Sequence, residues 1–258
     1  MAHDPAFDPA SDPPPPDPDV RDDGVPAHRA PRFLELEGAR NVRDLGGWPR
    51  ETGGTTPFDR VWRADSLVHA SDADRDRLHE VGVRTIFDLR NAVERENEPG
   101  AMHEDGRFDV QGVDLMAPLL EARHAGALDG DPFDLERMYV DLLATGRARF
   151  LALFERMHAA RDRGAVLVHC TAGKDRTGLV AATLLRAASV PEPAVLDEYV
   201  LTQERLAPIH DRLLASVVAT GVPEAAAPGL LGAERHYLEG ALPHVDDELL
   251  DAARGLLP

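Results

Sequence analysis

The chain has 258 residues, 43% of them hydrophobic, and a formal net charge of −18 at pH 7. This length and apolar content suffice for a full buried core, so we expect one domain with additions rather than two domains. The negative charge excludes broad binding to nucleic acids or anionic membranes, because both partners require a positive protein surface.

The cysteine content and the lengths of the apolar runs indicate the cellular location of the protein. The chain has one cysteine, which excludes an internal disulfide. No apolar run approaches the length of a membrane span, and the N-terminus lacks the basic-then-apolar pattern of a secretory signal. We therefore expect a cytoplasmic protein without integral membrane association, in which a reduced thiol persists.

The first 27 residues differ in composition from the rest of the chain. They hold seven Asp, one Arg and eight of the 21 prolines. Such a segment cannot bury enough apolar surface to offset the entropy of ordering it. We expect residues 1–30 to be a disordered, acidic, proline-rich tail, and residues 31–258 to form the folded domain.

The first half of the folded domain is predicted to alternate strands and helices. Apolar patterning predicts strands over residues 41–45, 60–63, 83–89 and 108–115. A helix is predicted over residues 72–81, with Ser71 or Asp72 as its N-cap and Gly82 as its stop. Two further helices are predicted over residues 134–144 and 148–161.

The second half is predicted to be mainly helical. An apolar strand over residues 165–168 leads into a loop, and a helix follows over residues 178–188 with apolar side chains at 3.6-residue spacing. From residue 193 onward we expect helices, with breaks at Pro208, residues 223–229 and Pro243. Strands alternating with helices predict an α/β fold with a central, mostly parallel sheet flanked by helices.

The loop after residue 168 carries the most informative motif, His-Cys-Thr-Ala-Gly-Lys-Asp-Arg-Thr-Gly at residues 169–178. It contains the only cysteine and the only lysine of the chain. A free thiol has a pKa near ~8.5, which helix N-termini and adjacent cations can lower to roughly 3.5–7.5. Because Cys170 precedes a predicted helix and lies near Lys174 and Arg176, we expect it to be a thiolate at neutral pH. The alternative is an inert, buried thiol.

The same loop suits a phosphate group. Its successive N–H groups can form an anion-binding nest, and Arg176 can bind two phosphate oxygens. Attack by Cys170 on phosphorus would give a phosphocysteine that water then hydrolyses. The residues expected to hold the substrate are Thr171, Ala172, Gly173, Lys174 and Thr177, with Gly173 allowing close backbone approach.

Two neighbours of the cysteine are predicted to support this chemistry. The Thr177 hydroxyl can stabilise the departing thiolate, and His169 is predicted to orient the loop by hydrogen bonding rather than to act as a base. A nucleotide-binding Walker loop is excluded, because its Gly-Lys is followed by Ser or Thr and here Asp175 follows.

The motif resembles the active-site loop of the bacterial tyrosine-specific phosphatases of the cysteine-dependent superfamily, the branch that includes secreted mycobacterial and listerial virulence phosphatases. Three upstream segments are similar to that branch's other motifs: residues 41–47, residues 60–67, and Phe-Asp-Leu-Arg at residues 87–90 followed by Glu94. The likeness spans roughly residues 34–249. Ala64 stands where the family pattern has Ser.

The resemblance implies roles for several residues. Cys170 would be the nucleophile and Arg176 the phosphate-binding arginine, with Arg43 and Asp44 of the first upstream motif in supporting positions. It also implies the cysteine-phosphatase fold, with a helical C-terminal lid at about residues 193–245. We expect no metal or organic cofactor, and the histidines show no spacing typical of a metal site.

A general acid must protonate the leaving oxygen, and two residues are candidates. The branch's loop carries an Asp at the position of Asp175 and is thought to use it as the acid. Asp88 is predicted at the carboxyl end of a strand, where α/β proteins place ligands. Its alternative role is a structural ion pair with Arg90 or Arg43.

Together these features predict a phosphomonoester hydrolase, with phosphotyrosine protein as the first substrate. Lys174 adds charge suited to substrates with several phosphates, so phosphoserine/threonine and phosphoinositide activities are neighbouring expectations. Two other classes remain alternatives. A rhodanese-like sulfurtransferase also uses a single loop cysteine, and a phosphopeptide-binding pseudophosphatase typically lacks the Cys or the Arg that this chain retains.

Overall fold

A five-stranded sheet lies at the centre of the computed structural model, which describes residues 32–131, 133–219 and 222–258. Its strand order is β1-β2-β5-β3-β4. β1 pairs antiparallel to β2, and the other neighbours pair in parallel, which confirms the predicted mostly parallel sheet. The strands are β1 (Arg43–Asp44), β2 (Val61–Ala64), β3 (Val83–Asp88), β4 (Asp109–Gly112) and β5 (Ala165–His169). The predicted acidic tail lies outside the described residues.

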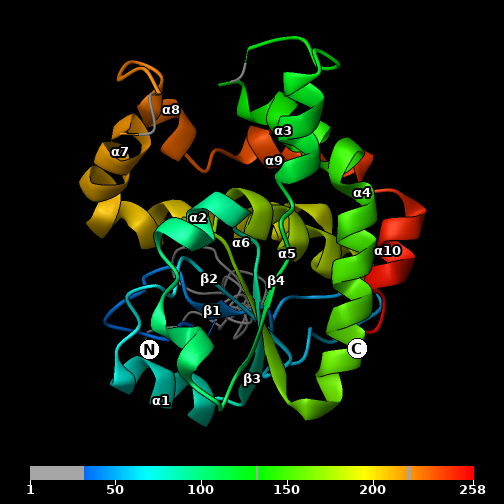
Figure 1. The fold of residues 1–258 in the computed structure, drawn as a ribbon. Helices are drawn as coiled ribbons and strands as arrows, with labels where there is room; N and C mark the ends of the chain where they lie inside the picture. The colour runs from blue at the N-terminus through cyan, green and yellow to red at the C-terminus, as the bar shows by residue number, and fades with distance from the viewer. Residues whose placement is uncertain (1–31, 132, 220–221) are drawn as a thin grey trace, which may run out of the picture.

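Helices flank this sheet and complete the predicted α/β class (Figure 1). The α-helices are α1 (Asp72–Glu80), α2 (Ala92–Asn97), α3 (Ala117–His124), α4 (Leu135–Ala160), α5 (Asp175–Ala187), α6 (Glu192–Leu206), α7 (His210–Ala219), α8 (Ala227–Leu231), α9 (Arg235–Glu239) and α10 (Asp247–Ala253). Short 3-10 turns are η2 (Ala101–Glu104), η3 (Arg161–Arg163), η4 (Ala207–Ile209) and η5 (Leu242–His244).

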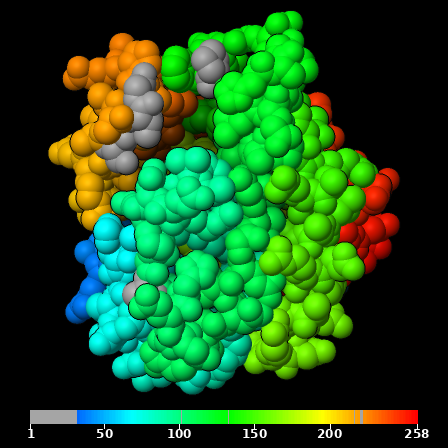
Figure 2. Space-filling view, viewed as in Figure 1, coloured from blue at the N-terminus to red at the C-terminus, as the bar shows by residue number. Residues whose placement is uncertain are grey.

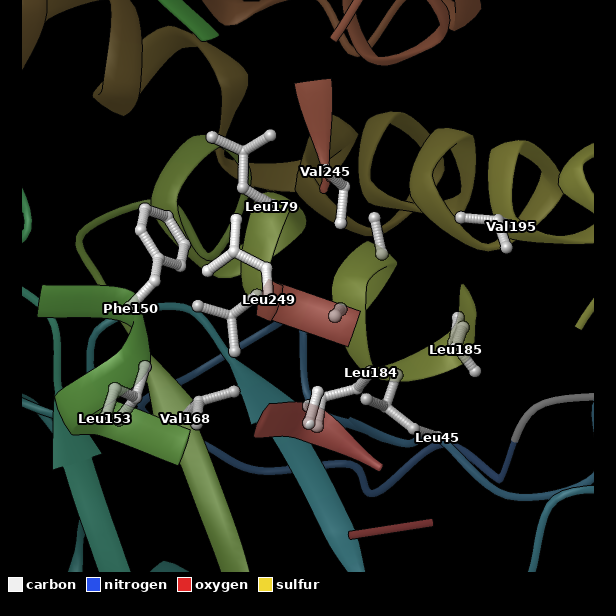
Figure 3. Close-up of a cluster of buried hydrophobic side chains, with 14 of the residues drawn as sticks. Leu45, Phe150, Leu153, Val168, Leu179, Leu184, Leu185, Val195, Val245 and Leu249 are labelled. Carbon is white, nitrogen blue, oxygen red and sulfur yellow. The ribbon is translucent and has the colours of Figure 1, made fainter. Parts of the chain in front are cut away.

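The sheet separates two hydrophobic clusters. The larger one joins β5 to α4, α5, α6, α9 and α10, and Figure 3 shows its side chains interleaving between these elements, among them Phe150, Val168, Leu184 and Leu249. The smaller one packs α1 and the chain before β2 against the opposite face, around Trp62 and Ile86. Because both faces are covered, all five residues of β5 are buried, as expected of a central parallel strand.

Three parallel strands end side by side at one edge of the sheet. Ala64 of β2 and Asp88 of β3 both pair with His169, the last residue of β5. Loops that follow these strands therefore begin next to one another. The carboxyl edge of a parallel sheet is where α/β proteins place their ligands.

The start and end of α1 follow the predicted capping. The Ser71 side chain accepts from the Asp74 N–H, and the Asp74 side chain accepts from the Ser71 N–H, which forms a capping box. Gly82, with φ of +88°, stops the helix.

One prediction of helix number is wrong. Residues 134–144 and 148–161 were expected to form two helices, but α4 runs unbroken from Leu135 to Ala160. Gly146 lies inside it and costs only about 1 kcal/mol relative to Ala. A Cβ at Gly146 would lie 3.5 Å from the Leu115 carbonyl oxygen, an ordinary van der Waals distance, so packing at this position does not require glycine. Patterning also missed the short helices α2 and α3.

The region expected to form the lid divides into two parts. α6 and α9 belong to the main core, with Tyr199 and Leu238 fully buried. α7 and α8 pack on each other and stand above the carboxyl edge of the sheet, next to α2 (Figure 1). α8 begins inside the break predicted at residues 223–229, because Pro228 sits in its first turn, where proline is tolerated. No helix in the described ranges is long and apolar enough to cross a membrane.

Candidate active site

The loop between β5 and α5 holds Cys170 at the middle of the carboxyl edge. Cys170 directly follows β5 and is 1% exposed. Gly173 has φ of +63°, and a Cβ at this position would lie 2.3 Å from the Ala64 carbonyl oxygen at the end of β2. Only glycine therefore allows the loop to turn this close to its neighbouring strand.

The carbonyl oxygens of the loop accept hydrogen bonds from the elements around it. The donors are Leu89 N to His169 O (2.8 Å), Ser66 N to Thr171 O (2.9 Å), Asn41 Nδ2 to Ala172 O and Gly173 O (both 3.1 Å), Arg63 Nη2 to Gly173 O, and Gly178 N to Lys174 O (2.8 Å). By contrast, no N–H group of residues 171–176 donates to an acceptor in the described part of the chain. Because a planar trans peptide points its N–H opposite its C=O, the N–H groups of residues 172–175, whose peptide carbonyls are held, face away from the scaffold. We call the free N–H groups of residues 171–176 the ring, an arrangement suited to binding an anion.

Arg176 is fixed by a carboxylate from α2. Its Nη1 lies 2.6 Å from Oε2 of Glu94, and its Nη2 lies 2.9 Å from Oε1 of the same residue. Burial opposes ionisation of Glu94, but the hydrogen bonds and charge of Arg176 outweigh it and lower the pKa of Glu94 to about 2. Nη1 also donates to the Leu89 carbonyl oxygen and Nη2 to the Thr171 hydroxyl, so Nε is the guanidinium nitrogen that has no acceptor among the described residues.

The sequence analysis named Glu94 within a matched segment but did not predict it as a site residue. It caps α2 by accepting at Oε2 from the Asn91 N–H, and its Oε1 also accepts from the Thr171 hydroxyl. Its role could have been predicted from its position, five residues after Leu89 in a segment that resembles a family motif. Glu94 thereby links the loop, the arginine and α2.

Lys174 does not extend toward the ring of N–H groups. Its ammonium donates to the carbonyl oxygens of Leu230 and of Gly232 (2.9 Å), at the end of α8, and lies 3.2 Å from Oδ1 of Asp175. The side chain is buried. The sequence predicted that this side chain adds charge beside a phosphate; in this structure α8 supplies the acceptors for its ammonium instead. The Lys174 N–H remains part of the ring.

Asp175 begins α5 and lies at the end of a tyrosine pair. The Tyr139 hydroxyl donates to Oδ1 of Asp175 over 2.6 Å. The Tyr139 and Tyr199 hydroxyl oxygens are 2.7 Å apart, so Tyr199 donates to Tyr139. Burial and the nearby Asp175 charge raise the pKa of Tyr139 well above its usual value, which keeps this donor protonated. The Asp175 side chain itself is 26% exposed.

Asp88 ends β3 but is engaged by its neighbour in sequence. Both of its oxygens accept from Arg90, with Nη2 to Oδ2 at 2.7 Å, and both side chains are buried. Burial alone would raise the pKa of Asp88, yet the Arg90 contacts lower it below its usual value. The alternative stated from the sequence, an ion pair with Arg90, is thus what the structure contains.

His169 is buried beside these groups. Its Nδ1 lies 3.1 Å from the Cys170 carbonyl oxygen, and its Nε2 lies 4.0 Å from Asp88. Burial lowers the pKa of His169, so the neutral ring is favoured. A neutral ring with a backbone contact to Cys170 is consistent with the orienting role expected for it.

The remaining predicted site residues are Thr177, Arg43 and Asp44, and their contacts differ. Thr177 is buried in the first turn of α5, and its hydroxyl has no hydrogen-bond partner among the described residues. Arg43 lies behind the loop and contacts Asn41 and Glu198. Asp44 instead organises the turn after β1, where its carboxylate accepts from Gly46 N (2.7 Å) and Asp59 N (2.8 Å), so it supports the fold around β1 rather than the loop itself.

Figure 2 shows the surface hollowed between α7 and α8 on one side and α3 on the other, above α2. A cavity of about 240 Å³ also reaches the loop at Thr171 and is lined by Ser66, Leu213 and Arg212. Among the residues described, no three His, Cys, Asp or Glu side chains gather as a metal site.

Comparison with known proteins adds an independent finding. Residues 34–253 match the model of the family described as "Tyrosine phosphatase family". The chain is 38% identical over 150 residues to a tyrosine-protein phosphatase of Nostoc commune, a match that covers 58% of this chain and 50% of that protein. It is 30% identical over 220 residues to a Cupriavidus necator protein named for the same activity, covering 83% of this chain and 78% of that one. It is 24% identical over 255 residues to the triple specificity protein phosphatase PtpB of Mycobacterium tuberculosis, covering 83% and 88%.

Proposed function

The chain belongs to the tyrosine phosphatase family, and from that membership we propose that it hydrolyses phosphotyrosine in proteins through a phosphocysteine intermediate. The observation that carries this proposal is the ring of uncommitted N–H groups over Cys170, with Arg176 at its margin. An anion that enters the ring gains these donors without breaking existing hydrogen bonds. The cysteine then lies at the base of the site that holds the phosphoryl group.

Substrate binding would use two sets of donors. The N–H groups of residues 171–176 hold the phosphoryl oxygens, and the free Nε–H of Arg176 adds a charge-assisted contact. Glu94 keeps the guanidinium in place before substrate arrives, so little side-chain entropy is lost on binding.

The chemical step would be an in-line displacement. The Cys170 thiolate attacks phosphorus and forms the S–P bond, while the bond from phosphorus to the tyrosine oxygen breaks. Asp175 gives its proton to the leaving oxygen. Water then attacks the phosphocysteine, Asp175 takes a proton from that water, and phosphate leaves as the thiolate is restored. Thr177, whose hydroxyl has no partner among the described residues, is available to stabilise that thiolate.

Asp175 is favoured over Asp88 as the acid by its surroundings. It lies in the loop and is partly exposed, and its contacts with the Tyr139 hydroxyl and the Lys174 ammonium both fall on Oδ1, which leaves Oδ2 without a contact among the described residues. Asp88 is buried and engaged by Arg90 through both oxygens, so it has no free path to a leaving group. We assign Asp88 a structural role.

The substrate range is proposed to include further phosphomonoesters. PtpB, which is similar to this chain over most of its length, is named for triple specificity. We propose phosphotyrosine protein as the principal substrate, with phosphoserine/threonine and phosphoinositide activities as secondary ones. The engagement of Lys174 with α8 favours this order, since a substrate with several phosphates would have to draw that ammonium away.

We propose a cytoplasmic location, an environment in which the free thiol of Cys170 stays reduced. The function itself is tested by phosphate release from phosphotyrosine, phosphoserine and phosphoinositide substrates. Wild type should act on phosphotyrosine, and Cys170→Ser, which keeps the shape of the loop, should not. Release of phosphate at equal rates by both proteins would refute the proposal, and thiosulfate turnover without phosphate release would support a sulfurtransferase instead.

A further inference from the structure

A fully buried ionic cluster lies behind the loop, on the side opposite the free N–H groups. Glu198 of α6 accepts from Arg43 Nε at 2.6 Å and from Arg63 Nη1 at 2.5 Å. Both arginine side chains are 0% exposed and that of Glu198 is 2% exposed. We refer to these three residues as the Arg43–Glu198–Arg63 cluster.

Arg63 connects this cluster directly to the loop. While its Nη1 binds Glu198, its Nη2 donates to the carbonyl oxygen of Gly173. The peptide that carries this carbonyl also carries the Lys174 N–H, one of the free donors of the ring. Since the peptide is planar, holding the oxygen from behind turns the N–H toward the anion side.

Asn41 holds the neighbouring peptide in the same way and depends on the cluster. Its Nδ2 contacts the carbonyl oxygens of Ala172 and Gly173, both at 3.1 Å, and its Oδ1 accepts from Arg43 Nη1. That contact fixes the amide so that its NH₂ group faces the loop. One carboxylate on α6 thereby aligns two donors that act on consecutive peptides.

The Arg43–Glu198–Arg63 cluster also has a net charge of one positive unit. Burial raises the pKa of Glu198, but the two arginines outweigh it and hold that pKa below its usual value. Burial and Arg63 lower the pKa of Arg43 only to about 10, so it stays protonated at neutral pH. Two cations and one anion leave one positive charge away from solvent, where its attraction for an anion in the adjoining loop is weakly screened.

The stability of the fold alone does not account for Arg63. Its Nε has no hydrogen-bond partner among the described residues, although the side chain is buried. An unsatisfied buried donor destabilises the folded state, and apolar replacements of buried ion clusters are often neutral or stabilising. The arrangement is explained if the guanidinium serves the loop.

We propose that Arg63 is a positioning residue for the anion-binding loop, which it serves by holding the Gly173 carbonyl from behind and by placing an unbalanced positive charge beneath the bound oxyanion. This inference deepens the proposed function and rests on it for the identity of the substrate. Arg63 does not touch the phosphoryl group. Its effect reaches the reaction through the direction of the loop N–H groups.

Binding of inorganic tungstate, measured by isothermal titration calorimetry, separates this role from catalysis. In Arg63→Met, which keeps the apolar stem and removes the charge, we expect the tungstate affinity to fall by about tenfold or more, the loss typical of one charge-assisted hydrogen bond. The iodoacetamide alkylation rate at Cys170 should fall as well, together with kcat. Leu78→Ala in α1 is the matched control, because it truncates a buried side chain of the opposite cluster and destabilises the fold without touching the loop.

The outcomes are distinguishable. A folded Arg63→Met protein that binds tungstate and is alkylated like wild type would overturn the inference, even if wild type is an active phosphatase. If Arg63→Met does not fold, the Arg63→Lys variant provides the test. Lysine keeps the charge but cannot contact Glu198 and the Gly173 carbonyl through two separate nitrogens, so we expect about threefold weaker tungstate binding. Unchanged binding would overturn the inference. If wild type binds tungstate yet releases no phosphate from phosphotyrosine, the proposed function fails while the binding comparison still tests Arg63.

Discussion

Tyr139 on α4 donates its hydroxyl to Oδ1 of Asp175, the first residue of α5, over 2.6 Å. This contact fixes the direction of the carboxyl group at the margin of the loop. Tyr199 on α6 extends the line by one more hydroxyl. Three consecutive helices, α4, α5 and α6, thus converge on the group to which we assign proton transfer.

The first prediction concerns this contact. Tyr139→Phe removes the donor and frees the Asp175 side chain, so kcat with phenyl phosphate should fall about tenfold, a part of the 10²–10⁴-fold that general acid catalysis contributes. With p-nitrophenyl phosphate, whose leaving group needs little protonation, the loss should be small. Tyr199→Phe is the matched control, since it removes the same atom one step away and should change either rate less. Equal losses on both substrates in Tyr139→Phe would show that the tyrosine does not act through the acid.

The second prediction compares the two candidate acids. Asp175→Asn should lower kcat on phenyl phosphate by about 10²-fold or more and on p-nitrophenyl phosphate much less, because only the poor leaving group requires a proton. Asp88→Asn should lower the free energy of unfolding by weakening the buried pair with Arg90, without dependence on the leaving group. A leaving-group dependence that appears in Asp88→Asn and not in Asp175→Asn would reverse the assignment.

The third prediction tests the carboxylate that fixes the arginine. In Glu94→Gln the two-point ion pair is lost and Arg176 becomes mobile. We expect KM for a phosphotyrosine peptide to rise by roughly tenfold, with a smaller change in kcat, because preorganisation for binding is what is removed. Steady-state kinetics with the Glu96→Gln variant as the control, an exposed carboxylate on the same helix, give the comparison. Unchanged KM would mean that the loop holds the arginine without Glu94.

The fourth prediction concerns pH and stability away from the site. Burial raises the pKa of Asp44 from 3.8 to about 6, so the folded state binds this proton more tightly than the unfolded chain. Its contribution to the free energy of unfolding is therefore greatest below the unfolded value and declines as pH rises toward about 6, by about 1–3 kcal/mol in all. Urea unfolding of wild type and Asp44→Asn at several pH values should show the difference between them shrinking or changing sign across that window. A difference that is constant with pH would contradict the shift.

Much of the candidate site could be predicted from short segments of the sequence. Cys170, Gly173 and Arg176 lie within one short segment from the end of β5 to the first turn of α5, so their spacing in the sequence largely fixes their geometry. The strand and helix alternation likewise predicted the parallel sheet. Asp88 and Arg90 are two residues apart, and their pairing was among the stated alternatives.

Contacts between distant segments could not be predicted in this way. Tyr139 lies 36 residues from Asp175, and Arg63 lies 110 residues from Gly173, so neither contact has a local pattern. The direction of the Lys174 side chain depends on the carbonyl oxygens of Leu230 and Gly232 at the end of α8, which lie 56 and 58 residues further along the chain. The unbroken α4 has buried side chains on both sides of Gly146, among them Leu143 and Phe150, and this tertiary packing offsets the low helix propensity of one glycine.

The most direct test of the account is whether Cys170 carries the phosphoryl group during turnover. Wild-type enzyme mixed with a phosphotyrosine peptide, quenched in acid and digested, should yield a phosphorylated peptide that contains Cys170 by mass spectrometry, and Cys170→Ser should release no phosphate. Phosphate release without a labelled Cys170 peptide, together with undiminished turnover in Cys170→Ser, would contradict the phosphocysteine mechanism.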